Sequence, residues 1–490
     1  MNKLLPLAIA SALLAGCASS NGLVAEGSLR DPATLSAGKS LGNAKVSDAA
    51  WPSERWWASF GDPQLDALVD EALSASPALD AADARTRKAI AQAGLADAAR
   101  KPSLGAGAQV LGLQIPETLA GPDLGGDFSV AELLTLNLKY NPDFWGADKA
   151  KWQAALGNAR AAEVDAQAAR LQLAANIVRA YVALAQAFDA QDAANAEAAR
   201  SDALVKLNQQ RIKAGLDNTI ALNQNQSASA AARQQAQAAQ QQIDALRNAL
   251  AALVGAGPDR GLEIARPMLA TPDVAVPSQL PSDLLARRAD IVAARWRVEA
   301  AQHGIDASKA AFYPTINLSM MVGLAAGNLG DLFGSHSLLV NAGPGLTLPI
   351  LDGGRLRNQL AGSDADYDLA VAGYDQALLG AMREVADAVQ SARSLDAQLA
   401  AATRARDDAR KAFDLASLRY KAGIASQIDV LNVQKPLLLL EQQVAILRAH
   451  RIAAAVDLDQ ALGGGLPASK LPMPEDASAF LSPSAPATTP

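Results

Sequence analysis

The pentapeptide Arg211-Ile212-Lys213-Ala214-Gly215 returns later in the chain as Arg419-Tyr420-Lys421-Ala422-Gly423, so that the two glycines lie 208 positions apart. The same separation pairs Gly146 with Gly354, Leu171 with Leu379, Leu250 with Leu458, and Gly255 with Gly463. A constant separation over so long a stretch indicates one architecture duplicated without insertions. Upstream, Pro102-Ser103-Leu104 matches Pro314-Thr315-Ile316 at a separation of 212. The sequence therefore predicts two repeats, residues 63–255 and 283–463.

Each repeat is expected to begin with a helix and to end with a long helical hairpin. The first helices are predicted over 63–100 and 283–311, and the long ones over 147–213 and 356–422. Each long helix would extend for roughly 100 Å at about 1.5 Å per residue, which a globular domain does not accommodate. Gly215 and Gly423 are the predicted hairpin tips, because glycine tolerates positive φ where a helix ends. The returning helices show the spacing of a coiled coil, and Pro436 should kink or unwind the second unless a neighbour compensates.

Between the helices, each repeat carries two segments that alternate apolar and polar residues, which predicts four strands at about 103–142 and 315–349. One interpretation is a soluble sheet with one face in water. The aromatic residues near one end of the strands favour a transmembrane sheet with a girdle at the membrane interface. This predicted girdle comprises Tyr140, Phe144, Trp145, Phe312 and Tyr313. Four strands cannot close a barrel, so a transmembrane sheet would require an oligomer.

The only cysteine, Cys17, ends the stretch Leu14-Ala15-Gly16-Cys17, which resembles the lipobox of bacterial lipoproteins. A basic start and an apolar stretch too short to span a bilayer precede it, which predicts a signal peptide over 1–16 and lipidation of Cys17. Ala18 follows the cysteine, and a residue other than Asp there favours the outer membrane by analogy. An ordinary buried thiol is the alternative. The sequence contains no run of eighteen apolar residues, so it predicts no membrane-spanning helix.

Composition and motifs exclude several classes of protein. The net charge of −7 argues against nucleic-acid binding. Aromatic residues make up 4% and charged residues 19%, and the long alanine-rich stretches indicate closely packed helices. His303, His336 and His450 lack the spacing of metal ligands, and Gly38-Lys39-Ser40 lacks the rest of a P-loop. We therefore predict no enzyme, no metal and no cofactor.

Dispersed motifs resemble the outer-membrane efflux protein family, the TolC-like and OprM-like export ducts, and more narrowly their NodT-type lipoproteins. The resemblance covers about residues 14–465. The motifs are Trp56-Trp57 with Phe60 and Pro63, residues 284–291, Phe312-Tyr313-Pro314, Leu348-Pro349-Ile350, Asp352-Gly353-Gly354-Arg355, Arg419-Tyr420-Lys421-Ala422-Gly423 and Asp429-Val430-Leu431. Arg288-Ala289-Asp290-Ile291 departs from the family's Arg-Pro-Asp-Ile, which loosens one turn.

The resemblance implies a mainly α fold with a small transmembrane β part. A homotrimer would form a long α-helical coiled-coil barrel and one shared twelve-stranded β-barrel, with four strands from each chain. An equatorial belt would come from residues 17–62, 256–282 and 464–490, with a disordered tail over 483–490. The protein would lie in the cell outer membrane and extend into the periplasm.

The resemblance also implies a function. The protein would be the outer-membrane channel component of a tripartite efflux pump, passively conducting drugs or other small solutes from periplasm to exterior. A periplasmic membrane-fusion adaptor would dock at the tips around Gly215 and Gly423, and an inner-membrane transporter, of the RND type, would supply the energy. A type I protein-secretion duct and a periplasmic coiled-coil lipoprotein without a pore remain as alternatives. A lipid-anchored hydrolase would need a catalytic cluster that the sequence does not offer.

The resemblance places the periplasmic aperture near the second glycine. Tyr420 and Asp429 match the family there, and Asn432 stands where a second acid is common. Three copies of Asp429 around a narrow pore would repel one another, raise their pKa and attract cations. The alternative is a solvated helix carboxylate without a role. In the first repeat, Ala221 replaces an acid sometimes found in the family.

Overall fold

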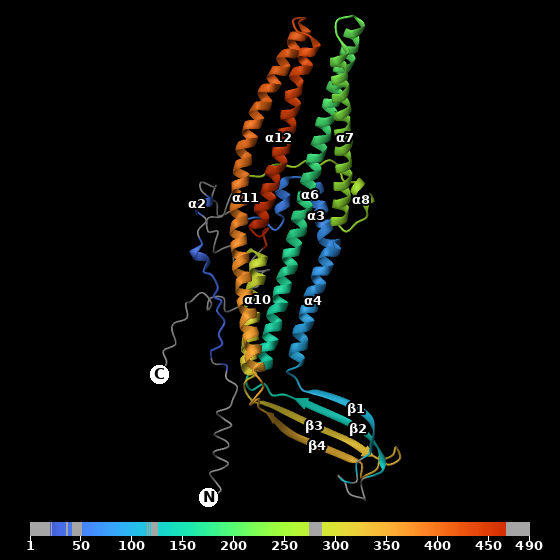
Figure 1. The fold of residues 1–490 in the computed structure, drawn as a ribbon, viewed down its shortest axis with the longest axis vertical. Coiled ribbons are helices and arrows are strands. Elements are labelled where there is room, and N and C mark those ends of the chain that lie inside the picture. Colours follow the sequence, from blue (N-terminus) through green and yellow to red (C-terminus); the bar gives the residue numbers. More distant parts are fainter. Residues whose placement is uncertain are drawn as a thin grey trace. The chain divides into compact units, whose positions relative to one another are not determined.

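The computed structural model describes residues 20, 22–35, 38–41, 51–114, 116, 118, 126–273 and 287–466. The predicted signal peptide, Cys17 and the predicted disordered tail lie outside the described residues. The chain, drawn in Figure 1, divides into two compact units. The first unit holds the sheet and comprises residues 1–29, 85–162 and 294–374. The second is helical and comprises residues 30–84, 163–293 and 375–490.

The helices recur at the separations seen in the sequence. The elements are η1 (Pro32–Thr34), α2 (Gly38–Leu41), η2 (Trp56–Phe60), α3 (Pro63–Ala75), α4 (Pro77–Ala98), α6 (Ala147–Lys213), α7 (Thr219–Leu253), α8 (Pro258–Leu262), α10 (Ala289–Ala310), α11 (Arg355–Lys421) and α12 (Gln427–Ala461). Adding 208 to the bounds of α6 and α7 gives those of α11 and α12, and adding 212 to those of α4 gives those of α10. The long helices have 67 residues each and the returning helices 35 each.

The prediction of one continuous helix over 63–100 is wrong, because the structure has two helices there, α3 and α4. Ser76 has an extended backbone with ψ of 124°, and the ring of Pro77 disfavours the helical conformation at the residue before it. In the second repeat, α10 begins at Ala289, and the predicted start of that helix at Asp283 lies outside the described residues. The helix α11 begins at Arg355, one residue before the predicted start. The helix α12 continues through Pro436.

The four strands form one antiparallel sheet in the order β1-β2-β3-β4. They span Ser103–Gln114, Phe128–Tyr140, Thr315–Ala326 and Leu338–Thr347. Leu104 lies opposite Leu138, which lies opposite Met320, which lies opposite Ala342. The next row is Gly105, Asn137, Met321 and Asn341. Since successive side chains point to opposite faces, this register collects the apolar residues of all four strands on one face.

The core of the helical unit lies where α3, α6, α7 and the end of α12 pack together. Its largest fully buried side chains include Phe60, Leu65, Tyr181, Ile243 and Leu250. Small residues of the predicted coiled-coil register are buried in α7, including Ser229, Ala232 and Ala236. They permit close helix packing.

Among the described helices, α6 is long and apolar enough to cross a membrane by length and composition alone. Half of its most apolar window is buried within the structure. In addition, Ile177, Val178 and Tyr181 of α6 are fully buried in the core of the helical unit. We therefore interpret α6 as a core helix.

Asp459, in the last turn of α12, predicts a pH dependence of stability. Burial raises the pKa of its carboxyl from 3.8 to about 7. The folded state therefore favours the neutral carboxyl. The contribution of this group to the free energy of unfolding is fully present below pH 3.8 and is lost as the pH rises through 7. We expect Asp459→Asn to raise the free energy of unfolding at pH 8 by roughly 2–4 kcal/mol and to change it little near pH 4. Thermal unfolding of both proteins at the two pH values measures this, and equal differences would contradict it.

Candidate functional site

The apolar face of the sheet is exposed in the single chain. Leu104, Leu346 and Leu338 are 70%, 71% and 65% exposed, and Leu136 and Val340 are more than half exposed. A soluble monomer rarely exposes so continuous an apolar surface. The outer strands of the sheet are β1 and β4, and within the described chain each pairs on one side only. Both the face and the two edges therefore require partners outside this chain.

The opposite face of the sheet is polar. It carries Thr135, Asn137 and Lys139 on β2 and Asn317 and Ser319 on β3. The amide of Asn137 donates to the hydroxyl of Thr135 at 3.1 Å. A sheet with one face for lipid and one for water is typical of a barrel wall around an aqueous lumen.

The predicted girdle residues lie near one end of the sheet. The indole of Trp145 stacks on Tyr313 with ring centres 4.8 Å apart, and its Nε1 donates to the carbonyl of Pro314 at 2.7 Å. Phe144 is 65% exposed, and with Trp145 and Tyr313 it lines a cleft of about 760 Å³. Tyr140 is the last residue of β2, and Phe312 lies between α10 and β3. Their position at a membrane interface stays a prediction.

The two hairpin tips have the same backbone turn. Gly215 and Gly423 have φ of 71° and 75°, and a Cβ at either would meet nothing within 4 Å. The amide of Gly215 donates to the carbonyl of Ile212 at 2.9 Å, and that of Gly423 to Tyr420 at 2.9 Å. These bonds satisfy carbonyls at the helix end. Each glycine is followed by an exposed apolar residue, Leu216 at 67% and Ile424 at 66%.

The charges at the two tips differ. In the first, Arg211 pairs with Asp217 at 3.1 Å. In the second, Ala425 occupies the position equivalent to Asp217, and the acid is Asp429, in the first turn of α12. Asp429 and Ser426 form a capping box, in which the Ser426 hydroxyl and amide donate to the carboxylate at 2.7 and 2.8 Å. These bonds satisfy donors at the start of the helix.

The capping box bears on the predicted charge of the aperture. Hydrogen bonds from the Ser426 hydroxyl and then its amide lower the pKa of Asp429 from its ordinary value. Within one chain this shift is opposite to the rise predicted for three copies around a pore, because the helix cap stabilises the charged form. Tyr420 and Asn432 are exposed. No hydrogen bond joins either to Asp429 among the described residues, and the role of all three in gating stays a prediction.

A hydrogen-bond network that the sequence reasoning missed joins α6 to the start of α3 and to the segment around Met268. Tyr181 of α6 is fully buried, and its hydroxyl donates to Asp62 at 2.8 Å. Asp62 also accepts the amide of Met268 at 2.8 Å and caps α3 through the amide of Gln64 at 3.0 Å. Desolvation is the largest cause that raises the pKa of the Tyr181 hydroxyl. A lone tyrosine in an alanine-rich helix was the available signal.

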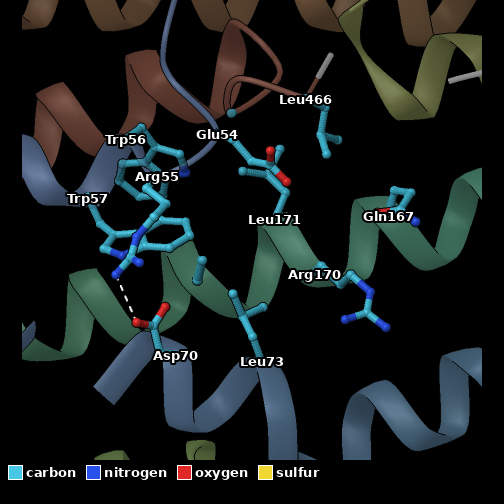
Figure 2. Close-up of a pocket in the computed structure, with 12 residues that line it drawn as sticks. Glu54, Arg55, Trp56, Trp57, Asp70, Leu73, Gln167, Arg170, Leu171 and Leu466 are labelled. Atoms are coloured by element: carbon cyan, nitrogen blue, oxygen red, sulfur yellow. Dashed lines mark hydrogen bonds and ion pairs between the residues drawn. The ribbon is translucent and has the colours of Figure 1, made fainter. Parts of the chain in front are cut away.

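The N-terminal and C-terminal segments meet at a pocket of about 530 Å³, shown in Figure 2. Trp56 and Trp57 form one wall, and Arg55 pairs with Asp70 at 2.8 Å beside it. Gly464 and Leu466, which follow α12, also line the pocket. The described chain contains no group of three or more His, Cys, Asp or Glu placed to hold a metal ion. At this pocket, the segment before α3 and the segment after α12 both lie against α6.

Comparison with known proteins identifies the class to which these surfaces belong. Residues 68–256 and 280–464 match the family described as "Outer membrane efflux protein". The chain is 36% identical over 361 residues to the fusaric acid resistance protein FusA of Burkholderia cepacia, covering 72% of this chain and 68% of FusA. It also resembles the outer membrane protein VceC of Vibrio cholerae, with a TM-score of 0.76, 36% identity, and coverage of 85% of this chain and 100% of VceC. The outer-membrane channel OprN gives a TM-score of 0.77 at 25% identity, covering 92% of this chain and 98% of OprN.

The fold and its surfaces are those of an outer-membrane channel for efflux, which confirms the function and the location predicted from the sequence. The chain belongs to the outer membrane efflux protein family. The predicted fold, mainly α with a small antiparallel sheet, is confirmed as well.

Proposed function

We propose that three copies of this chain share one twelve-stranded β-barrel in the outer membrane and continue into a helical duct in the periplasm. The observation that carries this proposal is the register of the sheet, which places an apolar row across all four strands and leaves β1 and β4 as edges. In lipid, every strand edge must be paired, so only a closed barrel is stable. Four strands from each of three chains reach a barrel of ordinary size.

The channel conducts passively and takes what an inner-membrane transporter of the RND type delivers through a periplasmic adaptor. Two features support docking at the tips: they repeat the same turn in both hairpins, and each presents an exposed apolar residue, Leu216 or Ile424. A trimer would therefore offer six similar sites to an adaptor. FusA is named for resistance to fusaric acid, which favours small-solute efflux over protein secretion. Lipidation of Cys17 would anchor each chain to the membrane.

Conductance in planar bilayers tests the proposed channel. Protein purified from outer membranes in mild detergent should give discrete conductance steps, small at rest because the tips narrow the duct. Opening the tips by protease or mutation should enlarge the steps. A protein that gives no steps in either state would contradict the channel and favour a lipoprotein without a pore.

The aperture has its own test in Asp429. We propose that three Asp429 carboxylates narrow the pore and attract cations, so Asp429→Ala should raise passive ion conductance by roughly two- to tenfold and weaken cation selectivity. Asp408→Ala is the matched control, because Asp408 is an exposed acid of α11 paired with Lys411. Equal conductance of wild type and Asp429→Ala in reconstituted trimers would leave Asp429 with its capping role alone.

A further inference from the structure

A cleft lined by aromatic and basic side chains lies where the sheet meets the first turns of α6 and α11. Its volume is about 760 Å³, a size typical of sites for small molecules. The stacked rings of Trp145 and Tyr313 line it, and the two side chains are 51% and 50% exposed. Since each ring covers only one face of the other, the pair presents an outer ring face to a further planar molecule.

The strand residues that line the cleft belong mostly to the polar face of the sheet. They are Thr315, Asn317 and Thr347, together with Ile316 of the apolar face. Asn317 shares the polar face with Ser319, Thr315 precedes Asn317 by two positions, and Thr315 lies opposite Thr347 in the register of β3 and β4. In the proposed barrel this face lines the aqueous lumen. The cleft is therefore placed where a solute in the duct passes it.

The two acids of the cleft are already engaged, whereas one of its cations is not. Asp143 accepts the amide of Lys149 at 2.7 Å, and Asp148 pairs with Lys151 at 2.9 Å. Arg355 also lines the cleft, but within the residues that the structure describes its guanidinium forms neither an ion pair nor a hydrogen bond. A free guanidinium offers a carboxylate two parallel donors. Arg355 is therefore available to an anion that enters the cleft.

Helix stability does not account for this arginine. Arg355 is the first residue of α11, where the helix dipole favours acidic residues and disfavours basic ones. Asp352 caps the helix, since its carboxylate accepts the amides of Gly354 and Leu356 at 3.0 and 2.9 Å. The equivalent helix of the first repeat, α6, begins with the neutral Ala147. The fold therefore does not require a positive charge at this position.

The stacked rings are not required by the fold either. The turns that lead into α6 and α11 are alike, because Gly146 and Gly354, 208 positions apart, both have positive φ, 75° and 87°. The second repeat nevertheless has Gly353 in place of Trp145. The same turn thus forms with and without the indole. The aromatic pair and the free arginine are features of this cleft rather than of the duplicated architecture.

We propose that this cleft is a transient binding site for planar aromatic anions on their way through the duct. The rings of Trp145 and Tyr313 stack on the aromatic part of the solute, and Arg355 binds its carboxylate through charge-assisted hydrogen bonds. The inference rests on the proposed function in one respect, namely that the polar face of the sheet lines a lumen. Binding must be weak, because a conducted solute has to leave again.

Binding of 2-naphthoate to the purified protein in mild detergent tests the site, measured by equilibrium dialysis against a blank of micelles alone. Arg355→Gln should weaken naphthoate binding about tenfold, because a hydrogen bond to a charged group is lost. Tyr313→Leu should weaken it about fivefold, because the ring pair is lost. The neutral 2-naphthylmethanol should bind the wild type about tenfold more weakly than naphthoate, and Arg355→Gln should leave its binding unchanged.

Arg357→Gln and Phe333→Leu are the matched controls. Arg357 is an exposed arginine two positions after Arg355 and does not line the cleft. Phe333 is 75% exposed and lies between β3 and β4, at the other end of the sheet. Neither substitution should change the binding of naphthoate. Far-ultraviolet circular dichroism checks that each variant is folded.

Naphthoate binding that Arg355→Gln and Tyr313→Leu leave unchanged, in folded protein, would overturn the site. Short-chain phosphatidylglycerol that binds more tightly than naphthoate, and depends on the same two residues, would also overturn it and make the cleft a phospholipid site. In planar bilayers, naphthoate should add current noise that Arg355→Gln reduces, and binding without such noise in a conducting channel would remove the cleft from the lumen. Absence of conductance would contradict the proposed channel instead, and dialysis would still decide whether the cleft binds aromatic anions.

Discussion

Gly463→Ala is expected to lower the free energy of unfolding of the helical unit by about 3–5 kcal/mol. Gly463 follows α12 with φ of 91°, and a Cβ there would lie 2.3 Å from the carbonyl oxygen of Arg287. The left-handed backbone costs alanine about 1–2 kcal/mol, and the rest of the loss arises because one of the two packed segments must move. The midpoint of thermal unfolding, followed by far-ultraviolet circular dichroism, measures the loss.

Gly215→Ala is the control for this prediction. Gly215 has φ of 71°, but a Cβ there would meet nothing within 4 Å. Alanine at Gly215 should therefore cost only about 1–2 kcal/mol, from the backbone alone. Equal effects of the two substitutions would show that the close approach of Gly463 to Arg287 does not limit stability.

Asp62→Ala is expected to have an effect of similar size, about 3–5 kcal/mol. The carboxylate accepts from Tyr181, from the amide of Met268 and from the amide of Gln64. Alanine would leave the buried Tyr181 hydroxyl and the Met268 amide without this acceptor and remove the cap of α3. Because three separate segments depend on Asp62, its loss should also loosen the packing between these segments, which limited proteolysis would detect.

Asp70→Ala is the matched control for Asp62. Asp70 pairs with Arg55 at 2.8 Å, but both side chains are about half exposed. Exposed ion pairs stabilise by less than about 1 kcal/mol. A loss at Asp70 as large as that at Asp62 would contradict the role given to burial in the Asp62 network.

The architecture was predictable because its signals are periodic. The repeated pentapeptide sets a separation of 208, and the helices α11 and α12 follow α6 and α7 at that separation. Strand alternation predicted the apolar face because one residue step changes the face of a strand. The break before Pro77 had a signal in the sequence, since a proline restricts the residue before it. The helical pattern continues on both sides of Pro77, which favoured one uninterrupted helix.

The local chemistry was less predictable because its partners are distant in sequence. Tyr181 and Asp62 are joined across 119 positions, and Arg200 and Leu431 across 231. No periodic pattern links such pairs. At Asp429 the signal was present, because serine three residues before an acid is typical of a capping box. The predicted repulsion requires three copies of Asp429 around a pore. Within one chain, the helix cap lowers the pKa of Asp429.

The duplication repeats one close contact between a glycine and a carbonyl in both halves of the chain. Gly255 and Gly463, which are 208 positions apart, both have positive φ and both lie against a carbonyl, that of Ala75 or that of Arg287. Ala75 and Arg287 are themselves 212 positions apart, as are the starts of α4 and α10. The turn that departs from the family at Ala289 is held by Arg288, which pairs with Asp290 and Glu384 at 2.6 and 2.8 Å.

The mass of the purified protein in mild detergent tests most directly whether the sheet is a shared barrel wall. A chain of 50.5 kDa that supplies four of twelve strands should give a particle with about 150 kDa of protein. Light scattering with correction for bound detergent, or native mass spectrometry, measures this mass. We predict a trimer that persists on dilution, because separation would expose the edges of β1 and β4. A stable, folded monomer of about 50 kDa would contradict the shared barrel.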